Sequence, residues 1–250
     1  MENLVVSINN SIQRVYVLDG QRTCCSDDPR LPVGRHPLAG GGMSSSQLSP
    51  SDRMTQTIVV EKDAKADIVI LIMPGVSCDI KLDVTLAGEG AEANIYGAYV
   101  CGGAEKVKIA VDMHHDLPHC NSRQLFKGIA GGKSRVDFYG KIIVAKDAQR
   151  TEAYQENHNI LLSDHAKVDT KPQLEIYADD VKCSHGATIG RLNEEEQFYM
   201  RSRGITLEDA KVLQMISFIA PVLDNIPDPG QREAIGEQFE SEIRNIIHKV

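Results

Sequence analysis

Residues 134–144 read SRVDFYGKIIV, and this stretch shows how the middle of the chain is built. Apolar side chains alternate with other residues between Val136 and Val144, as they do along a β-strand. A small residue, Ser134, stands just before the strand. Similar short phrases precede other strands at irregular spacing, so the chain carries a loose internal repeat.

Residues 56–190 consist of such strands, with almost no helical periodicity between them. Because no long helix separates the strands, alternating strand–helix–strand units are excluded. Many short strands with loose repetition favour a parallel β-helix, a solenoid, with a β-sandwich as the alternative. The strands predicted here are 58–60, 67–73, 80–86, 93–100, 106–113, 136–144, 153–162, 167–176 and 181–183.

Residues 1–55 and 191–250 differ from this strand-rich core. Two short strands, 4–8 and 14–18, are predicted near the start. They are followed over 21–51 by a long irregular segment rich in proline, glycine and serine. The last part of the chain is helical. We therefore expect a mainly β protein in which the β-helix core is followed by a small C-terminal α-helical domain.

Helix boundaries are marked in the C-terminal region. Asn193 and Glu196 have the spacing of a capping box, and Gly204 stands where that helix would end. Thr206 with Asp209 caps the next helix. A final helix has an apolar face made of Ile235, Phe239, Ile243, Ile246 and Ile247.

The composition limits the possible functions. The chain has 250 residues and a net charge of −8, which argues against a nucleic-acid-binding surface. Its apolar stretches are too short to span a bilayer, and its start lacks the layout of a signal peptide. Six cysteines without a CxxC motif indicate reduced thiols. We expect a cytoplasmic protein that binds neither nucleic acid nor membrane.

Two kinds of enzyme chemistry find little support. Gly132 and Lys133 resemble the end of a phosphate-binding loop, but the first glycine of that motif is replaced by Lys127 and a strand follows, which favours a tight turn. A carbohydrate-active β-helix enzyme would need paired carboxylates in an aromatic-lined groove. Asp179 and Asp180 are adjacent, so on a strand they would face opposite sides.

Two groups of residues are candidates for binding metal or sulfur. His114, His115, His119 and Cys120 lie close together in sequence, but their spacing fits no standard zinc pattern, and a turn between strands is the alternative. Cys183 and His185 share a face if the chain is extended there. A thiol and an imidazole on one face can bind iron, or they can be a buried cysteine and a hydrogen-bonded histidine at a strand end.

Three amides, Gln155, Asn157 and Asn159, also alternate along one strand and so point to one side. They either form hydrogen bonds to neighbouring turns of a solenoid or lie on a solvated face. The residues alone leave both interpretations open.

A series of phrases between His115 and Phe218 resembles the SufB/SufD family, the β-helical scaffold proteins of the SUF system of iron–sulfur cluster assembly. The most specific is ADDVKCSHGATIG at residues 178–190, in which CSHGAT is more similar to SufD than to SufB. The other phrases are FYGKI at 138–142, AQRT at 148–151, QENHNILLS at 155–163, PQLEI at 172–176 and FYMRSRGI at 198–205.

This resemblance implies a β-helix core and a C-terminal helical domain that docks the ATPase SufC. The resemblance further implies that SufB-like and SufD-like subunits pair through their β-helices, and that closure of two SufC subunits distorts the interface where a SufB cysteine meets a SufD histidine. By position in the motif His185 matches that histidine, and Cys183 lies at the corresponding strand end. Both are candidate ligands of an iron–sulfur cluster bound transiently at an interface.

The helical residues 198–219 are then the candidate surface for a SufC-type ATPase. The partner-binding residues expected there are Phe198, Tyr199, Arg201, Arg203, Leu213 and Phe218.

Family members are typically longer and begin with a helical region, so we expect a SufD-like protein shortened at its N-terminus. It would pair with a SufB-like subunit or with itself, and a two-fold axis would bring two copies of Cys183 and His185 together. The expected function is a non-enzymatic scaffold for iron–sulfur cluster assembly. The alternatives are a stand-alone homodimeric interaction module and, with less support, the carbohydrate-active enzyme.

Overall fold

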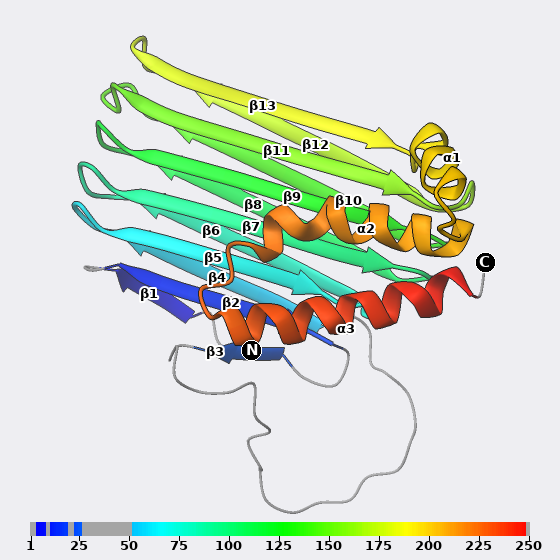
Figure 1. Ribbon diagram of the computed structural model, residues 1–250. Coiled ribbons are helices and arrows are strands. Elements are labelled where there is room, and N and C mark those ends of the chain that lie inside the picture. Colours follow the sequence, from blue (N-terminus) through cyan, green and yellow to red (C-terminus); the bar gives the residue numbers. More distant parts are fainter. Residues whose placement is uncertain (1–3, 9–10, 20–22, 27–51, 249–250) are drawn as a thin grey trace, which may run out of the picture.

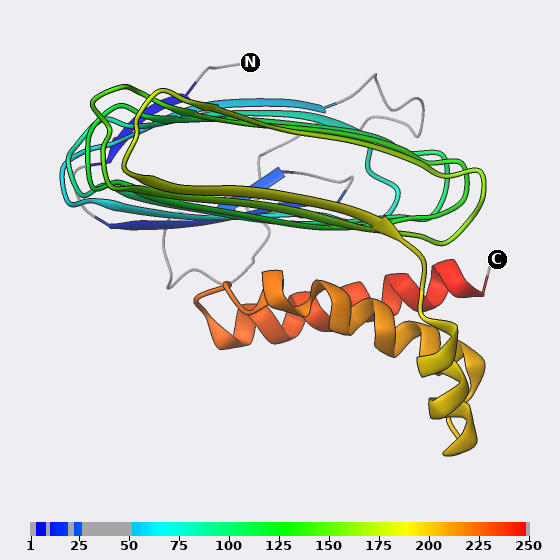
Figure 2. The ribbon, with the colours of Figure 1, turned by 90° about the horizontal axis from the view of Figure 1, so that it is seen from above.

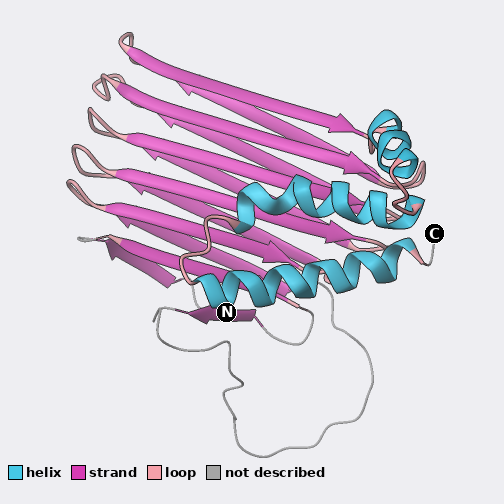
Figure 3. Cartoon of the chain, viewed as in Figure 1, coloured by secondary structure: helices cyan, strands magenta, loops and turns pink. Residues whose placement is uncertain are grey.

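The computed structural model describes residues 4–8, 11–19, 23–26 and 52–248, which form a β-solenoid followed by three helices (Figure 1). Strands and helices are separated along the chain (Figure 3). The elements are β1 (Leu4–Ile8), β2 (Ile12–Leu18), β3 (Thr23–Ser26), β4 (Asp52–Val60), β5 (Lys65–Ile72), β6 (Cys78–Leu86), β7 (Glu92–Cys101), β8 (Lys106–His115), β9 (Asn121–Ala130), β10 (Arg135–Val144), β11 (Thr151–Leu161), β12 (Lys167–Ile176), β13 (Val181–Gly190), α1 (Glu194–Ser202), α2 (Leu207–Leu223) and α3 (Pro229–Ile247).

The strands form two sheets that face each other (Figure 2). One sheet has the order β1-β4-β6-β8-β10-β12 and the other β13-β11-β9-β7-β5-β2-β3. Neighbouring strands are parallel except for the pair β2 and β3. The predicted parallel β-helix is therefore confirmed, and the sandwich alternative is wrong.

The length of a solenoid turn varies along the chain. Asp52 of β4 lies beside Cys78 of β6, a separation of 26 residues. Arg135 of β10 lies beside Lys167 of β12, a separation of 32 residues. Such differences are absorbed in the turns between strands, which explains why the phrases that precede the strands recur at irregular spacing.

Apolar side chains from successive turns stack inside the solenoid. Ile80, Ile109 and Phe138 occupy the same position in three neighbouring strands, and each is at most 2% exposed. Burial of each such side chain contributes about 1.5–3 kcal/mol to folding. The next position in this column, on β12, is Thr170, so the apolar column ends with a polar residue in the last turn.

A second apolar layer lies between the sheet that contains β13 and the helices α2 and α3, which cover its outer face (Figure 2). The strands contribute Val17, Leu71, Val100 and Ile129, and these strands are apolar on both faces because they are covered on both faces. The helices contribute Met215, Ile219, Phe239 and Ile243, among others. None of the helices in the described ranges is long and apolar enough to cross a membrane.

The helix caps observed in the structure are those predicted from the sequence. The side chain of Asn193 accepts hydrogen bonds from the backbone N–H groups of Glu195 and Glu196, and its amide donates to the Glu196 carboxylate at 3.2 Å. Gly204 has a φ of 89°, the left-handed conformation in which helices commonly end. Thr206 accepts a hydrogen bond from the N–H of Asp209.

Several details of the strand prediction are wrong. Strand β4 begins at Asp52, six residues before the predicted start at 58. Strand β9 lies where no strand is predicted, because its inward positions begin with Ser122 and Gln124 rather than with apolar residues. Strand β13 continues to Gly190, well beyond the predicted end at 183. Within the segment predicted to be irregular, Thr23–Ser26 form a strand paired with β2, and residues 27–51 lie outside the described residues.

Candidate functional site

Within the described part of the chain, the last turn of the solenoid, formed by β12 and β13, has a neighbouring strand on one side only. We call these two strands the open end. Large apolar side chains are exposed along or beside it: Ile176 by 40%, Tyr177 by 63% and Ile189 by 46%. An edge strand also presents unpaired backbone N–H and C=O groups, and a solenoid end without a polar cap is poorly suited to contact with water. The open end therefore has the properties of an interaction surface.

Cys183 and His185 lie on the inward side of β13, at the open end. Cys183 pairs in register with Ala153 of β11 and packs against the apolar core, while remaining partly accessible. His185 pairs with Gln155 and is exposed, because no further strand covers it. The sequence prediction that a thiol and an imidazole share one face of an extended strand is thus confirmed. Partial burial raises the pKa of the Cys183 thiol, so it is protonated at neutral pH unless a metal ion or another cation stabilises the thiolate.

The column of residues beneath His185 changes from apolar to polar along the solenoid. Ile68, Ile95, Gln124, Gln155 and His185 occupy the same inward position in five successive strands of one sheet. The two glutamines are fully buried, and Nε2 of Gln155 donates to Oε1 of Gln124 at 3.1 Å. The sequence pattern does not single out Gln124, because it lies on β9, the strand that the alternation of apolar residues does not predict.

The other two amides of β11 occupy the next two inward positions, Asn157 beside Phe126 of β9 and Asn159 beside Gly128. Asn157 and Asn159 are at most 2% exposed, and Nδ2 of Asn159 donates to Oδ1 of Asn157. The hydroxyl of Tyr99, two turns away on β7, donates to Oδ1 of Asn159. Of the two interpretations of these amides, hydrogen bonding between turns is therefore confirmed, and a solvated face is wrong.

The second group of candidate ligands does not converge. His115 points inward and its Nε2 lies 2.9 Å from Oγ of Ser122, whereas His114 points outward and its Nε2 lies 3.7 Å from Oδ1 of Asp83. Cys120 is buried and its thiol donates to the backbone oxygen of Gly88. Within the described ranges, no three histidine, cysteine or acidic side chains form a group that can hold a metal ion.

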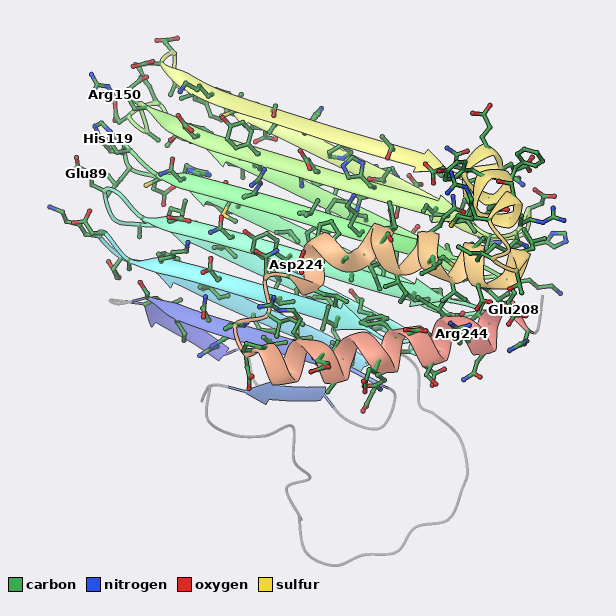
Figure 4. The ribbon with its side chains drawn as sticks, viewed as in Figure 1. Glu89, His119, Arg150, Glu208, Asp224 and Arg244 are labelled. Carbon is green, nitrogen blue, oxygen red and sulfur yellow. The ribbon has the colours of Figure 1, made fainter. Side chains whose placement is uncertain are left out.

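His119 occupies a turn along one edge of the solenoid, and Arg150 occupies the equivalent turn next to it (Figure 4). Both have a positive φ, near 60°, which the turn geometry requires. The backbone N–H of His119 donates to the oxygen of Gln149 at 2.9 Å, linking the two turns. The exposed Asp180 lies 3.7 Å from Arg150 on the same edge.

Gly131 to Ser134 form the predicted tight turn, with the Ser134 N–H donating to the oxygen of Gly131.

The buried His115 predicts a loss of stability in mild acid. Burial lowers the pKa of His115 to about 4, from an ordinary value of 6.5, so the unfolded chain takes up this proton first as the pH falls. The free energy of unfolding should therefore decrease between pH 6.5 and pH 4, by about 3 kcal/mol in total from this one group. Urea denaturation at a series of pH values measures the decrease.

The matched variant is His115→Gln, which retains a polar group near Ser122 but takes up no proton. Above pH 7 it should lose a roughly constant amount of stability relative to the original protein. The difference between the two proteins should shrink as the pH falls toward 4. Parallel curves over the whole pH range would contradict the assignment of this acid sensitivity to His115.

The predicted partner-binding residues cluster around α1. Phe198 and Tyr199 are 72% and 59% exposed, and the Arg203 guanidinium lies 5.0 Å from the centre of the Tyr199 ring. Leu213 of α2 is 47% exposed. Phe218 is half-buried, with the Lys127 ammonium 4.7 Å from its ring centre.

Two hollows flank α1. The first, of about 560 Å³, lies between α1, α2, α3 and the end of β11, and both Phe198 and Arg201 line it. The second, of about 650 Å³, lies on the other side of α1, and Tyr199, Leu213 and Phe218 line it. The structure thus brings the six predicted residues to one region of the helical surface, although they are spread over 21 positions of the sequence (198 to 218).

Comparison with known proteins identifies the family. Residues 49–218, more than half of the chain, match the family described as the SufBD core domain of SUF system FeS cluster assembly. The chain belongs to the SufBD family. The matched region contains the solenoid from β4 onward, α1 and most of α2, so it includes the open end and the residues that line the hollows beside α1, except Ile246 and Ile247 of α3.

Several SufBD relatives share part of this chain. It is 48% identical over 123 residues to the iron–sulfur cluster assembly protein SufD of Escherichia coli, covering 49% of this chain and 29% of that protein. It is 47% identical over 110 residues to a SufBD family protein of Synechocystis, covering 44% and 24%. It is 39% identical over 142 residues to the chloroplast protein ABCI7 of Arabidopsis thaliana, covering 55% and 29%. The chain therefore spans less than a third of the length of each of these relatives.

Proposed function

We propose that this SufBD family protein is a non-enzymatic, SufD-like scaffold for iron–sulfur cluster assembly that acts in the cytoplasm. The observation that carries the proposal is the placement of Cys183 and His185 together on the inward side of the terminal strand β13. Thiolate and imidazole are both ordinary ligands of iron in iron–sulfur proteins. A cluster bound here would be cargo, held at an accessible site from which it can leave.

The donor set of the open end favours a shared site. Fe–S clusters are commonly held by four side chains, whereas β13 offers one thiol and one imidazole. The described residues place no third histidine, cysteine or carboxylate beside them. A second protein chain therefore supplies the remaining ligands, either a SufB-like subunit or a second copy of this protein. The unpaired edges of β12 and β13 and the exposed apolar side chains beside them support docking at this end.

The helices supply the surface for a SufC-type ATPase. Exposed aromatic and arginine side chains are the residues that most often dominate the binding energy of protein interfaces. Phe198, Tyr199, Arg201 and Arg203 all lie on or directly after α1, between two hollows that a partner's side chains can fill. Since α1 follows β13 after only three residues, a partner bound to α1 contacts the same terminal turn of the solenoid that carries the proposed cluster site. Cys183 and His185 lie toward the start of β13, about 17–23 Å along the strand from its end at Gly190.

The test is complex formation with the SufC-type ATPase of the same organism, followed by size-exclusion chromatography with light scattering. We expect a stable complex, whose mass gives its stoichiometry. Replacing both Phe198 and Tyr199 with alanine should weaken binding by about tenfold or more, because two exposed aromatic anchors are removed. Titration calorimetry measures the affinity of each variant.

Leu117→Ala is the matched control. Leu117 is also an exposed apolar residue, 38% accessible, but it lies in the turn between β8 and β9 and lines neither hollow. Its replacement should leave the affinity unchanged. A protein that forms only a homodimer and ignores the ATPase would contradict the docking proposal and favour a stand-alone interaction module. Unchanged cluster delivery in cells after Cys183→Ala and His185→Ala would lead to the same conclusion for the cluster site.

A further inference from the structure

Gln155 has one buried polar atom that nothing in the described structure satisfies. Its side chain is fully buried, and its Nε2 is used in the hydrogen bond to Oε1 of Gln124. Its Oε1 is inaccessible to water and has no hydrogen-bond partner among the described residues. A buried acceptor without a partner costs about 1–3 kcal/mol, so its presence calls for an explanation.

The facing sheet holds the Gln155 amide in place. Gly140 of β10 lies directly opposite, and a Cβ atom added to Gly140 would lie only 1.6 Å from Nε2 of Gln155. The amide therefore occupies the space that a side chain at 140 would fill. With its nitrogen committed to Gln124, on the strand beneath, the oxygen is free to interact with the strand on the other side, which is β13.

The residue beside Gln155 on β13 is His185. Paired residues on neighbouring strands are about 5 Å apart, and both side chains point inward. The imidazole of His185 is exposed, and within the described part of the chain it makes no hydrogen bond. His185 therefore offers a ring N–H donor on the strand next to the amide oxygen.

We propose that Gln155 is a positioning residue for His185. Its buried Oε1 accepts a hydrogen bond from one ring nitrogen of His185, which fixes the tautomer and leaves the lone pair of the other nitrogen facing out of the open end. Histidines that bind metals usually have such a partner on their second nitrogen, and its loss typically weakens metal binding 10- to 100-fold. The role of His185 as a cluster ligand rests on the proposed function, whereas the hydrogen bond itself does not.

The experiment measures the tautomer of His185 directly. The protein is labelled with ¹⁵N-histidine, and the two ring nitrogens are observed by NMR under alkaline conditions, so that the neutral imidazole is seen. His185→Gln identifies the signal by its absence. The same protein unfolded in urea gives the reference ratio of the two tautomers. We expect a shift of about tenfold from that ratio in the folded protein, as a hydrogen bond of ordinary net strength produces.

Two variants should remove the preference by different routes. Gln155→Leu deletes the acceptor, and Gly140→Ala leaves Gln155 in the sequence but displaces its amide. In both, the tautomer ratio should return to the unfolded reference. The matched control is Asn157→Leu, which removes another fully buried amide of β11 whose neighbour on β13 is Ala187 rather than a histidine. This control should keep the preference, although it loses stability.

A folded protein in which His185 shows the reference ratio would overturn the proposal. So would a preference that survives Gln155→Leu, or one that Asn157→Leu abolishes equally. The outcome is independent of the scaffold function, which cluster delivery in cells tests separately. If the variants lose the tautomer preference while His185→Gln leaves delivery unchanged, the hydrogen bond is supported and the cluster role of His185 is not.

Discussion

Replacing Tyr99 with alanine should lower the free energy of unfolding by about 5 kcal/mol. The ring is fully buried inside the solenoid, and its removal leaves a cavity that the rigid turns cannot close, which costs about 3–5 kcal/mol. The hydroxyl also donates to Asn159, whose buried oxygen would lose its partner at a further cost of about 1–3 kcal/mol. Urea denaturation followed by circular dichroism measures the loss.

Tyr99→Phe separates the two contributions, because it keeps the ring and removes only the hydroxyl. It should cost about 1–3 kcal/mol. Gly128→Ala offers a complementary test, since the added Cβ would lie 2.1 Å from the Tyr99 ring. The clash should be much weaker in the Tyr99→Ala background, giving a measurable coupling between the two sites. Equal losses for Tyr99→Ala and Tyr99→Phe would show that packing of the ring contributes nothing.

Replacing Glu105 with alanine should cost about 3 kcal/mol, the second-largest effect that we expect. The carboxylate is only 8% exposed and joins two neighbouring turns of the solenoid. Oε1 accepts from the N–H of Gly75 at 3.0 Å and of Gly102 at 3.2 Å, and Oε2 accepts from Gly103 at 2.8 Å. Hydrogen bonds to a charged group are stronger than neutral ones, and alanine would leave all three donors without this acceptor.

Glu89→Ala is the control for this effect. Glu89 lies in a turn at the other edge of the solenoid, beside the turn of His119 (Figure 4), and its side chain is exposed. Its replacement should change stability by less than about 0.5 kcal/mol. The loss of stability in Glu105→Gln should lie between the losses in Glu105→Ala and Glu89→Ala, because glutamine retains one acceptor oxygen and loses the charge. If Glu105→Ala and Glu89→Ala had the same small effect, the carboxylate would not join the turns as described.

Much of the fold can be read from the sequence because the two-residue alternation is a local property. The alternation of apolar residues predicts both a strand and its inward face, without any knowledge of the neighbouring turns, at Val136, Phe138 and Ile142. Strand β9 is not predicted for the same reason, because the prediction depends on this local alternation. Its first inward residues are Ser122 and Gln124, and polar residues at inward positions remove the local signal.

The candidate site could be predicted only in part. The spacing of Cys183 and His185 is enough to place them on one face, since only the direction of a single strand matters. That His115 and His114 point to opposite sides follows from the same rule, and it is why that group does not converge. Nothing in the sequence shows that β13 is the last strand of its sheet, which is what makes His185 accessible.

The sequence by itself therefore determined the strand-rich core, the helical end and the placement of a thiol and an imidazole on one face of a strand, and it favoured a parallel solenoid over a sandwich without deciding between them. These depend on periodicity, helix caps and residues two positions apart, all of which are local. The tertiary structure alone decided that Gln155 lies beneath His185, that Tyr99 reaches Asn159, and that one end is left open. The reason is that neighbours in a solenoid are one turn apart in the chain, and from β4 onward the length of that turn varies between 26 and 32 residues.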